Sequence, residues 1–446
     1  MFRILLFSIT GICMAMDSCV STIRQKKIVQ LTHSASGHTL HHNGVFSKDG
    51  RWVVYDGRND DTAIGQTTTI GVVDLRTGAE KIIYRTQNSS EYGPGVGAAS
   101  FSPTTDKVIF IHGLPDADKG KPYAFTRRTG VAVDLENPFV PINVDARDVT
   151  FPYTPGSLRG GTHSHCWSAD GRLISFTYND ELVESDLRTV GIMFDTGNPV
   201  RVDAHSGNNN GTCYAAIVAD VVAHPRSGSD EISKAFDECW VGEKGYIDAQ
   251  GKNVPYAIAF QGNTKNAKGK TITEIYIVDI DSAAILHDQS AVGGLGERPH
   301  VPNGIRQRRI SRTARGLSST VRHWLRASND GRYVYALAED DKKRTQVVRC
   351  EINSGKLDYL TRNDFSITSP FNLSPDGNKI AFAGQNDVYL LDVNTHELKQ
   401  LTHHKPLDGK IAGAPCFSPD GKIILFNQYL PDENKNQFLQ ILAVLL

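Results

Sequence analysis

The feature that most constrains this chain is a short turn motif, Ser-x-Asp-Gly, that recurs between two apolar segments. Full copies stand at residues 47–50, 168–171, 328–331, 374–377 and 418–421, and a weaker copy stands at 102–106. An Asp-Gly turn between two apolar runs predicts a β-hairpin. A second hairpin follows each copy, so each repeat of about 40–50 residues supplies four strands, which is typical of β-propeller blades.

The number of repeats predicts an all-β fold, a seven-bladed β-propeller that residues 26–446 form as a single domain. The blades are expected to begin near Asn43, Gly97, Thr162, Thr212, Val321, Ser369 and Ala412. The fourth blade lacks the Asp-Gly turn, and we expect it to carry insertions between about 212 and 310.

The two ends of the chain predict how the ring closes. The seventh blade is short of one strand at its C-terminal end, while residues 27–33 resemble 398–403, the expected outer strand of the sixth blade. We therefore predict that the N-terminal strand, residues 26–32, completes the seventh blade and closes the ring. A ring closed in this way leaves no free sheet edge.

Residues 1–18 are typical of a secretory signal peptide, with a positive start at Arg3 and an apolar run too short to span a membrane. Cleavage before Cys19 would give an acylated lipoprotein, and ordinary cleavage nearby is the alternative. We expect a periplasmic or outer-membrane lipoprotein of a Gram-negative bacterium, or a secreted protein, with membrane contact only through a lipid anchor. The formal net charge of -1 argues against a nucleic-acid partner.

The repeats resemble those of TolB-like propellers, whose blades contain Pro-Asp turns. Six ordered segments resemble more closely a bacterial propeller family of unassigned function, to which ulvan-degrading polysaccharide lyases are similar. These segments are residues 161–165, 175–180, 228–232, 239–242, 306–309 and 322–324. The resemblance covers most of the mature chain, and it is specific for the family rather than for an activity.

Histidines recur at one register of the expected innermost strands. When the strands are aligned on the Ser of each turn, His42, His163 and His323 all stand five residues before it. Equivalent positions meet around the axis of a propeller, so three imidazoles there could bind a divalent metal such as Zn, Mn or Ca. Hydrogen bonding to water or to neighbours is the alternative. We expect His165, two residues further on, to share a face with His163.

A lyase that acts on a uronic acid must neutralise the carboxylate, remove the neighbouring proton and protonate the leaving oxygen. The resemblance to ulvan lyases implies two histidines, a tyrosine and an arginine in these roles. Carried across, it assigns His163 and His165 as catalytic histidines and Arg226 as the arginine. The chain departs from the pattern at Glu181, where histidine is expected and which could act as a base, and at Asn209, where tyrosine is expected.

An arginine-rich window bears on the substrate. Residues 298–329 contain no Asp or Glu, and the window leads into Arg322 and Trp324 of the expected channel. Arg322, Arg308 and Arg309 are therefore candidates for binding carboxylates or sulfates. Trp324 is a candidate for stacking on a sugar ring, although buried packing is the more usual role of Trp.

Two functions follow from these observations. The first is an exported propeller that acts on an anionic polysaccharide or oligosaccharide as an ulvan-type lyase, by β-elimination at a uronic acid. The alternative is a non-catalytic TolB-like propeller that binds a glycan or an envelope protein. The histidine register and the arginine window favour the lyase, while the departures at Glu181 and Asn209 favour the binding module.

Overall fold

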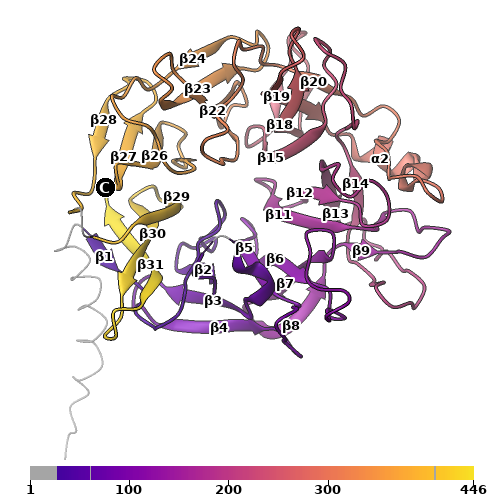
Figure 1. Ribbon diagram of the computed structural model, residues 1–446, viewed down its shortest axis with the longest axis horizontal. Helices are drawn as coiled ribbons and strands as arrows, with labels where there is room; N and C mark the ends of the chain where they lie inside the picture. The colour runs from indigo at the N-terminus through magenta and orange to yellow at the C-terminus, as the bar shows by residue number, and fades with distance from the viewer. Residues whose placement is uncertain (1–27, 61, 406–407) are drawn as a thin grey trace, which may run out of the picture.

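A computed structural model describes residues 28–60, 62–405 and 408–446. Seven antiparallel sheets stand around one axis (Figure 1), which confirms the predicted all-β, seven-bladed β-propeller. The predicted signal peptide and Cys19 lie outside the described residues. Within the described part of the chain, none of the helices combines the length and the apolar character that a bilayer crossing requires.

The blades are described from the innermost strand outward. In blade 1 the innermost position is taken by the irregular segment 39–46, which forms the isolated bridges Thr39–Asp56 and Phe46–Val53 with the next strand. The regular strands of blade 1 are β2 (Trp52–Asp56), β3 (Thr69–Asp74) and β4 (Glu80–Arg85), its second to fourth positions. Blade 2 contains β5 (Val96–Phe101), β6 (Lys107–Gly113), β7 (Arg128–Asp134) and β8 (Asn137–Asn143). Blade 3 contains β11 (Gly161–Trp167), β12 (Leu173–Asn179), β13 (Thr189–Phe194) and β14 (Tyr214–Ile217). Blade 4 contains β15 (Lys234–Trp240), β18 (Ala257–Lys265), β19 (Thr271–Asp279) and β20 (Gln307–Arg309).

The remaining blades follow the same order. Blade 5 contains β21 (Arg326–Ala327), β22 (Tyr333–Glu339), β23 (Thr345–Glu351) and β24 (Leu357–Tyr359). Blade 6 contains β25 (Asn372–Leu373), β26 (Lys379–Gly384), β27 (Asp387–Asp392) and β28 (Leu398–Gln400). Blade 7 contains β29 (Ile411–Phe417), β30 (Ile423–Pro431), β31 (Gln437–Leu445) and β1 (Ile28–Gln30).

The Ser-x-Asp-Gly motif builds the turn between the first two strands of a blade. In the first copy, Ser47 Oγ donates to Asp49 Oδ1 at 2.6 Å and accepts from the backbone N–H of Trp52 at 2.9 Å. The Gly has a φ near 70° in all five full copies, a conformation that costs glycine little. The same local bonds recur in the other copies, which is why the repeats could be recognised from the sequence.

The ring closes as predicted. Strand β1 pairs antiparallel with β31, with Val29 opposite Ala443, and forms the outermost strand of blade 7 (Figure 1). The core consists of apolar layers between neighbouring blades, such as the layer between blades 1 and 2 that contains Val54, Val72 and Phe110. These layers fix the positions of the innermost strands around the axis.

The fourth blade begins later than the repeat spacing predicted. The segment after Thr212 is β14, which pairs with β13 as the outermost strand of blade 3, so blade 4 begins at β15. Blade 4 carries the hairpin of β16 (Tyr246–Ile247) and β17 (Asn253–Val254), and a connection that contains α2 (Ser282–His287). Strands β9 (Ala146–Arg147) and β10 (Ser157–Leu158) form a small parallel pair before blade 3.

Four innermost strands contain a β-bulge, which interrupts their pairing in blades 2, 3, 4 and 7. In blades 2, 3 and 4 the bulge places a residue other than glycine at positive φ. These residues are Ala98 at 56°, Ser164 at 52° and Asp237 at 50°. A bulge adds one residue and breaks the alternation of side chains along the strand, so it redirects what the strand presents to the axis.

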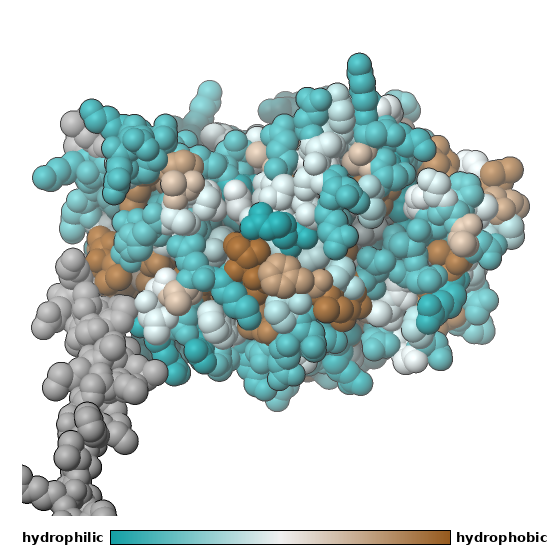
Figure 2. Space-filling view, turned by 90° about the horizontal axis from the view of Figure 1, so that it is seen from below, coloured by the Kyte–Doolittle hydropathy of each residue, from teal (hydrophilic) through white to brown (hydrophobic). Residues whose placement is uncertain are grey.

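The flank of the ring near β4 and β8 is mostly hydrophilic, with a small group of apolar side chains (Figure 2). Strand β8, the outer edge of blade 2, carries exposed Phe139 and Val140. Single exposed apolar residues are common on soluble proteins, and the charged and apolar groups that matter for chemistry lie instead at the axis.

Candidate functional site

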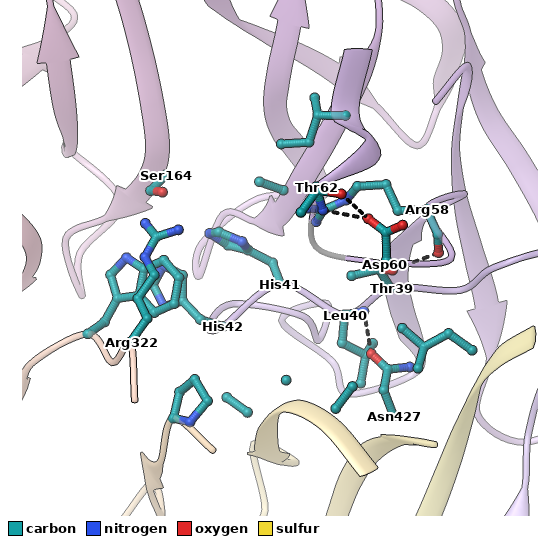
Figure 3. A pocket seen from close by; sticks show the side chains of 18 of the residues that line it. Thr39, Leu40, His41, His42, Arg58, Asp60, Thr62, Ser164, Arg322 and Asn427 are labelled. Carbon is teal, nitrogen blue, oxygen red and sulfur yellow. Dashed lines mark hydrogen bonds between the residues drawn. The ribbon is translucent and has the colours of Figure 1, made fainter. Parts of the chain in front are cut away.

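A cavity of about 630 Å³ lies at the axis of the propeller. The innermost strands and the loops that connect the blades form its walls, and Figure 3 shows part of its lining. In this view His41 extends from blade 1 toward Arg322 and Ser164, which come from other blades. Side chains that are far apart in the sequence therefore meet in one enclosed space.

Four arginines line the cavity, one from each of blades 1, 2, 3 and 5. They are Arg58, Arg128, Arg188 and Arg322. Arg58 pairs with Asp56 at 2.7 Å, and Arg322 pairs with Asp237, the residue of the blade 4 bulge, at 2.8 Å. These two pairs fix two guanidinium groups at the wall.

The other two cavity arginines have no carboxylate within ion-pair distance among the described residues. Arg188 Nε donates to the amide oxygen of Asn179 at 2.8 Å, and Arg128 Nε donates to the backbone oxygen of Phe125 at 3.3 Å. Burial, followed by repulsion from Arg322 and Arg128, lowers the pKa of Arg188 to about 10. The cavity thus holds unneutralised positive charge, which suits a carboxylate or another oxyanion.

His163 lines the cavity, and only one of its two ring nitrogens is hydrogen-bonded to a described residue. Asn179 Nδ2 donates to the backbone oxygen of Ser185 at 2.7 Å, which leaves Asn179 Oδ1 as the acceptor for His163 Nε2 at 3.1 Å. The proton of the neutral ring is therefore on Nε2 and the lone pair is on Nδ1, which is buried and has no hydrogen-bond partner in the part of the chain that the structure describes. Burial, then Arg128 and Arg188, hold the pKa of His163 well below its ordinary range.

A stack of three side chains forms another wall. The rings of His42 and Trp324 lie 3.9 Å apart and nearly parallel, and the guanidinium carbon of Arg322 lies 4.3 Å from the Trp324 ring. Arg326 Nη2 lies 3.1 Å from His42 Nδ1, and because arginine only donates, the proton of neutral His42 is on Nε2. Burial, and then the neighbouring His41, lower the pKa of His42 well below 6.5.

Tyr123 adds a hydroxyl group to the cavity. Its oxygen is buried without a hydrogen-bond partner among the described residues, and burial raises its pKa above the ordinary value. The Arg128 guanidinium lies 5.4 Å from the Tyr123 ring centroid. The cavity therefore combines a protonated hydroxyl group, neutral imidazoles and unneutralised guanidinium groups.

The predicted site residues divide into two groups, and four of them line the cavity. These are His42, His163, Arg322 and Trp324. His323 does not, because its Nδ1 donates to the backbone oxygen of Val321 at 2.9 Å and its Nε2 accepts from the N–H of Leu337 at 3.0 Å. The predicted three-histidine metal site is thus not assembled. Within residues 28–60, 62–405 and 408–446, no group of three or more His, Cys, Asp or Glu could hold a metal ion.

His165 does not share a face with His163, contrary to the expected alternation. The bulge at Ser164 separates the two residues, and His165 Nε2 bonds to Thr162 Oγ1 at 3.0 Å. A Cβ atom added to Gly130 of blade 2 would lie 2.8 Å from this nitrogen, so the ring packs against the neighbouring blade.

Glu181 and Arg226 lie away from the cavity. Glu181 forms ion pairs with Arg127, at 3.1 Å, and with Arg147. The side chain of Arg226 is 79% exposed and pairs with Glu231 at 2.8 Å. The structure therefore places these two residues in ion pairs outside the cavity walls.

Arg308 and Arg309 lie on β20, the outermost strand of blade 4, rather than at the axis. Arg308 Nη2 donates to the hydroxyl of Tyr246 at 2.7 Å, and Arg309 pairs with Glu274 at 3.1 Å. Only the last part of the arginine-rich window reaches the cavity.

Several cavity residues with ionisable side chains were not predicted from the sequence. They include His41, Arg58, Tyr123, Arg128 and Arg188. Arg128 begins β7 and Arg188 immediately precedes β13, the corresponding third strands of two neighbouring blades. Aligning the third strands as well as the innermost strands would have revealed these two arginines.

Comparison with known proteins places the chain among β-propellers. A solved oligogalacturonate lyase in complex with manganese has a TM-score of 0.51 and 13% identity, covering 94% of this chain and 93% of that chain. A putative TolB from Agrobacterium tumefaciens has a TM-score of 0.41 and 14% identity, covering 85% of this chain and 99% of that chain. At such low identity the likeness to the lyase concerns the fold alone.

Two further matches concern the family. Residues 95–209 match a family described as a protein of unknown function (DUF3748). The uncharacterized protein YidR of Escherichia coli (strain K12) is 33% identical over 413 residues, which cover 90% of this chain and 94% of YidR. Because this identity extends over nearly the whole of both chains, the protein belongs to the same family as YidR.

Proposed function

We propose that this protein is an exported propeller that binds an acidic saccharide in its axial cavity and cleaves it by β-elimination at a uronic acid. The observation that carries the proposal is the convergence of arginines from four blades with neutral imidazoles around one cavity. The sequence resemblance to ulvan-type lyases supports this reaction class, and a solved oligogalacturonate lyase has a similar fold.

Arg128 and Arg188 are suited to bind the substrate carboxylate, because no carboxylate of the described residues lies within ion-pair distance of either guanidinium group. Their charge stabilises the enolate-like state that forms when the proton on the neighbouring carbon is removed. His163 Nδ1 takes this proton, since the lone pair is on that nitrogen and the ring is neutral at ordinary pH.

The second half of the reaction breaks the glycosidic bond. The electron pair of the broken C–H bond forms the carbon–carbon double bond, and the bond to the leaving oxygen breaks with its electron pair on oxygen. Tyr123, whose hydroxyl group stays protonated because burial raises its pKa, donates a proton to that oxygen. Water then carries the proton from His163 back to Tyr123. This scheme uses no metal, because His323, one of the three predicted ligands, uses both ring nitrogens for backbone bonds.

The test measures ultraviolet absorbance at about 235 nm, where the unsaturated uronide product absorbs. The protein is first incubated with a panel of uronic polysaccharides and oligosaccharides. We expect a rise with the wild-type protein and its loss in His163→Ala and Arg188→Met. Arg226→Met, at an exposed ion pair outside the cavity, is the matched control and should retain the rise.

No rise on any substrate would refute the lyase proposal. Binding of a uronide by calorimetry without cleavage, lost in Arg188→Met, would instead support the alternative of a non-catalytic propeller that binds a glycan.

A further inference from the structure

One layer of residues lies beyond the cavity, at the position two residues before the Ser of each inner turn and, in blade 4, which lacks that turn, at the equivalent register position of Cys239. Strand register shows that each blade contributes one residue to this layer. The layer consists of Val45, Ser100, Cys166, Cys239, Arg326, Asn372 and Cys416. Each of the seven is at most 9% exposed, and none of them lines the cavity. The channel is therefore closed at this level.

Arg326 closes the layer across the axis. Its Nε donates to the side-chain oxygen of Asn372 in blade 6 at 2.7 Å, and its Nη2 donates to the backbone oxygen of His42 in blade 1 at 2.8 Å. Asn372 Nδ2 in turn lies 3.4 Å from the sulfur of Cys416 in blade 7. A buried charge held by several hydrogen bonds is costly to displace, so a ligand cannot push through this level.

The opposite end of the cavity is open. Asp60, Thr320, Arg322 and Lys410 all line the cavity and are exposed to solvent. The charged groups proposed to bind the carboxylate, Arg128 and Arg188, line the same cavity and are half-buried. The cavity thus has a mouth and a floor.

We infer that the cavity is a blind pocket that takes the end of an acidic saccharide chain and does not let a polymer pass along the axis. The chemical class of this ligand rests on the proposed function, whereas the closure rests on the Arg326 layer. A volume of about 630 Å³ is typical of pockets for small ligands, so a few sugar units fill it. Substrate enters and product leaves through the same mouth.

The inference is tested by binding, so that its outcome does not depend on cleavage. His163→Ala is titrated by calorimetry with a galacturonate dimer, trimer and hexamer, and with hexamers that carry a bulky aromatic group at the reducing or the non-reducing end. We expect the affinity to reach its limit at the trimer and to change little at the hexamer. One of the two end-blocked hexamers should bind at least about 10-fold more weakly, which corresponds to about 1.4 kcal/mol.

Long polygalacturonate gives a second measurement. A blind pocket predicts a stoichiometry that follows the number of chain ends rather than the number of sugar units. The inference fails if affinity keeps increasing beyond the hexamer, if neither blocked end weakens binding, or if no galacturonide binds. If the wild-type protein binds ends but never cleaves, the proposed elimination fails while the blind pocket stands.

Discussion

At the scale of single residues, the charge state of His163 depends on which groups surround its ring. Burial is the largest cause of the low pKa of His163, and Arg128 and Arg188 add to it by repelling a second proton. Asn179 accepts a hydrogen bond from the proton-bearing ring nitrogen. The same two arginines are the candidates for binding a carboxylate, so one pair of side chains serves two purposes. They keep the base neutral before substrate arrives, and the bound carboxylate then offsets their charge during the reaction.

Removal of one of these arginines should therefore change the titration of His163. In Arg128→Met we expect the pKa of His163 to rise toward its ordinary value, because a repelling positive charge has been removed. NMR titration of histidine labelled at the ring carbon measures this pKa directly, without an activity assay. Arg226→Met, at the exposed ion pair with Glu231, should leave it unchanged. An unaltered pKa in Arg128→Met would show that Arg128 does not contribute to the low pKa of His163.

The charge state of Glu238 affects the stability of the whole protein. It is 1% exposed, and neither carboxyl oxygen has a hydrogen-bond partner among the described residues. Burial is the largest cause that raises its pKa from 4.5 to about 8. Because the folded state holds this proton more tightly than the unfolded state, the stability contribution is present below pH 4.5 and is lost as pH rises toward 8.

Glu238→Gln should remove this dependence on pH. Between about pH 5 and pH 8 the carboxyl group lowers the free energy of unfolding by roughly 1.4 kcal/mol per pH unit. Urea unfolding at both pH values should therefore show a smaller loss of stability in the variant than in the wild-type protein. The exposed Glu136→Gln is the matched control and should behave like wild type. Equal pH dependence in Glu238→Gln and wild type would contradict the raised pKa.

At the scale of single elements, the innermost strands show what a sequence reveals and what it hides. The inner turns were predictable because Ser, Asp and Gly form them through local hydrogen bonds. The bulges were not predictable, because Ala98, Ser164 and Asp237 take up positive φ although none of them is glycine. This is why register placed His42 and His163 at the cavity but failed for His165, which follows a bulge.

The sequence-based prediction was incomplete at blade 4 and at the third strands for the same reason. No turn motif marks the start of β15, so spacing alone assigned the segment after Thr212 to blade 4. Arg128 and Arg188 were missed because no turn motif marks the start of a third strand, so only an alignment of the third strands would have revealed them. Their meeting at the axis depends on the packing of whole blades.

The bulge in β5 allows a paired test of backbone strain. Ala98 has a φ of 56°, so Ala98→Gly should raise the free energy of unfolding by about 1 kcal/mol, because a side chain is costly in this conformation. Ala99, its buried neighbour, is not among the residues at positive φ. Ala99→Gly should lower stability by about 0.5–1 kcal/mol. Opposite signs in urea unfolding are expected, and destabilisation by both substitutions would show that the Ala98 backbone is unstrained.

At the scale of the whole molecule, the cavity exists only while the ring stays closed. Strand β1 joins the first described residues to the last strand of the chain, and Thr32 Oγ1 donates to the side-chain oxygen of Gln440 at 2.7 Å. Leu31 packs in the layer that blades 1 and 7 share, with Ile441 as one of its neighbours. Blade 1 is the blade with the fewest regular strands, so this contact supports the part of the ring that supplies His41, His42 and Arg58.

A chain that begins at Leu31 lacks β1 and should test the closure. We expect it to be less stable than a chain that begins at Lys27 by about 2 kcal/mol, since the partly buried Ile28 and Val29 side chains are lost. The edge of β31 would also be free to pair with another chain, so light scattering should show association that increases with protein concentration. A synthetic peptide of residues 26–34 in excess should restore the monomer, because it can pair with that edge. If the shortened chain were monomeric and equally stable, blade 7 would hold its place without β1, and closure of the ring would rest on the apolar layers between blades instead.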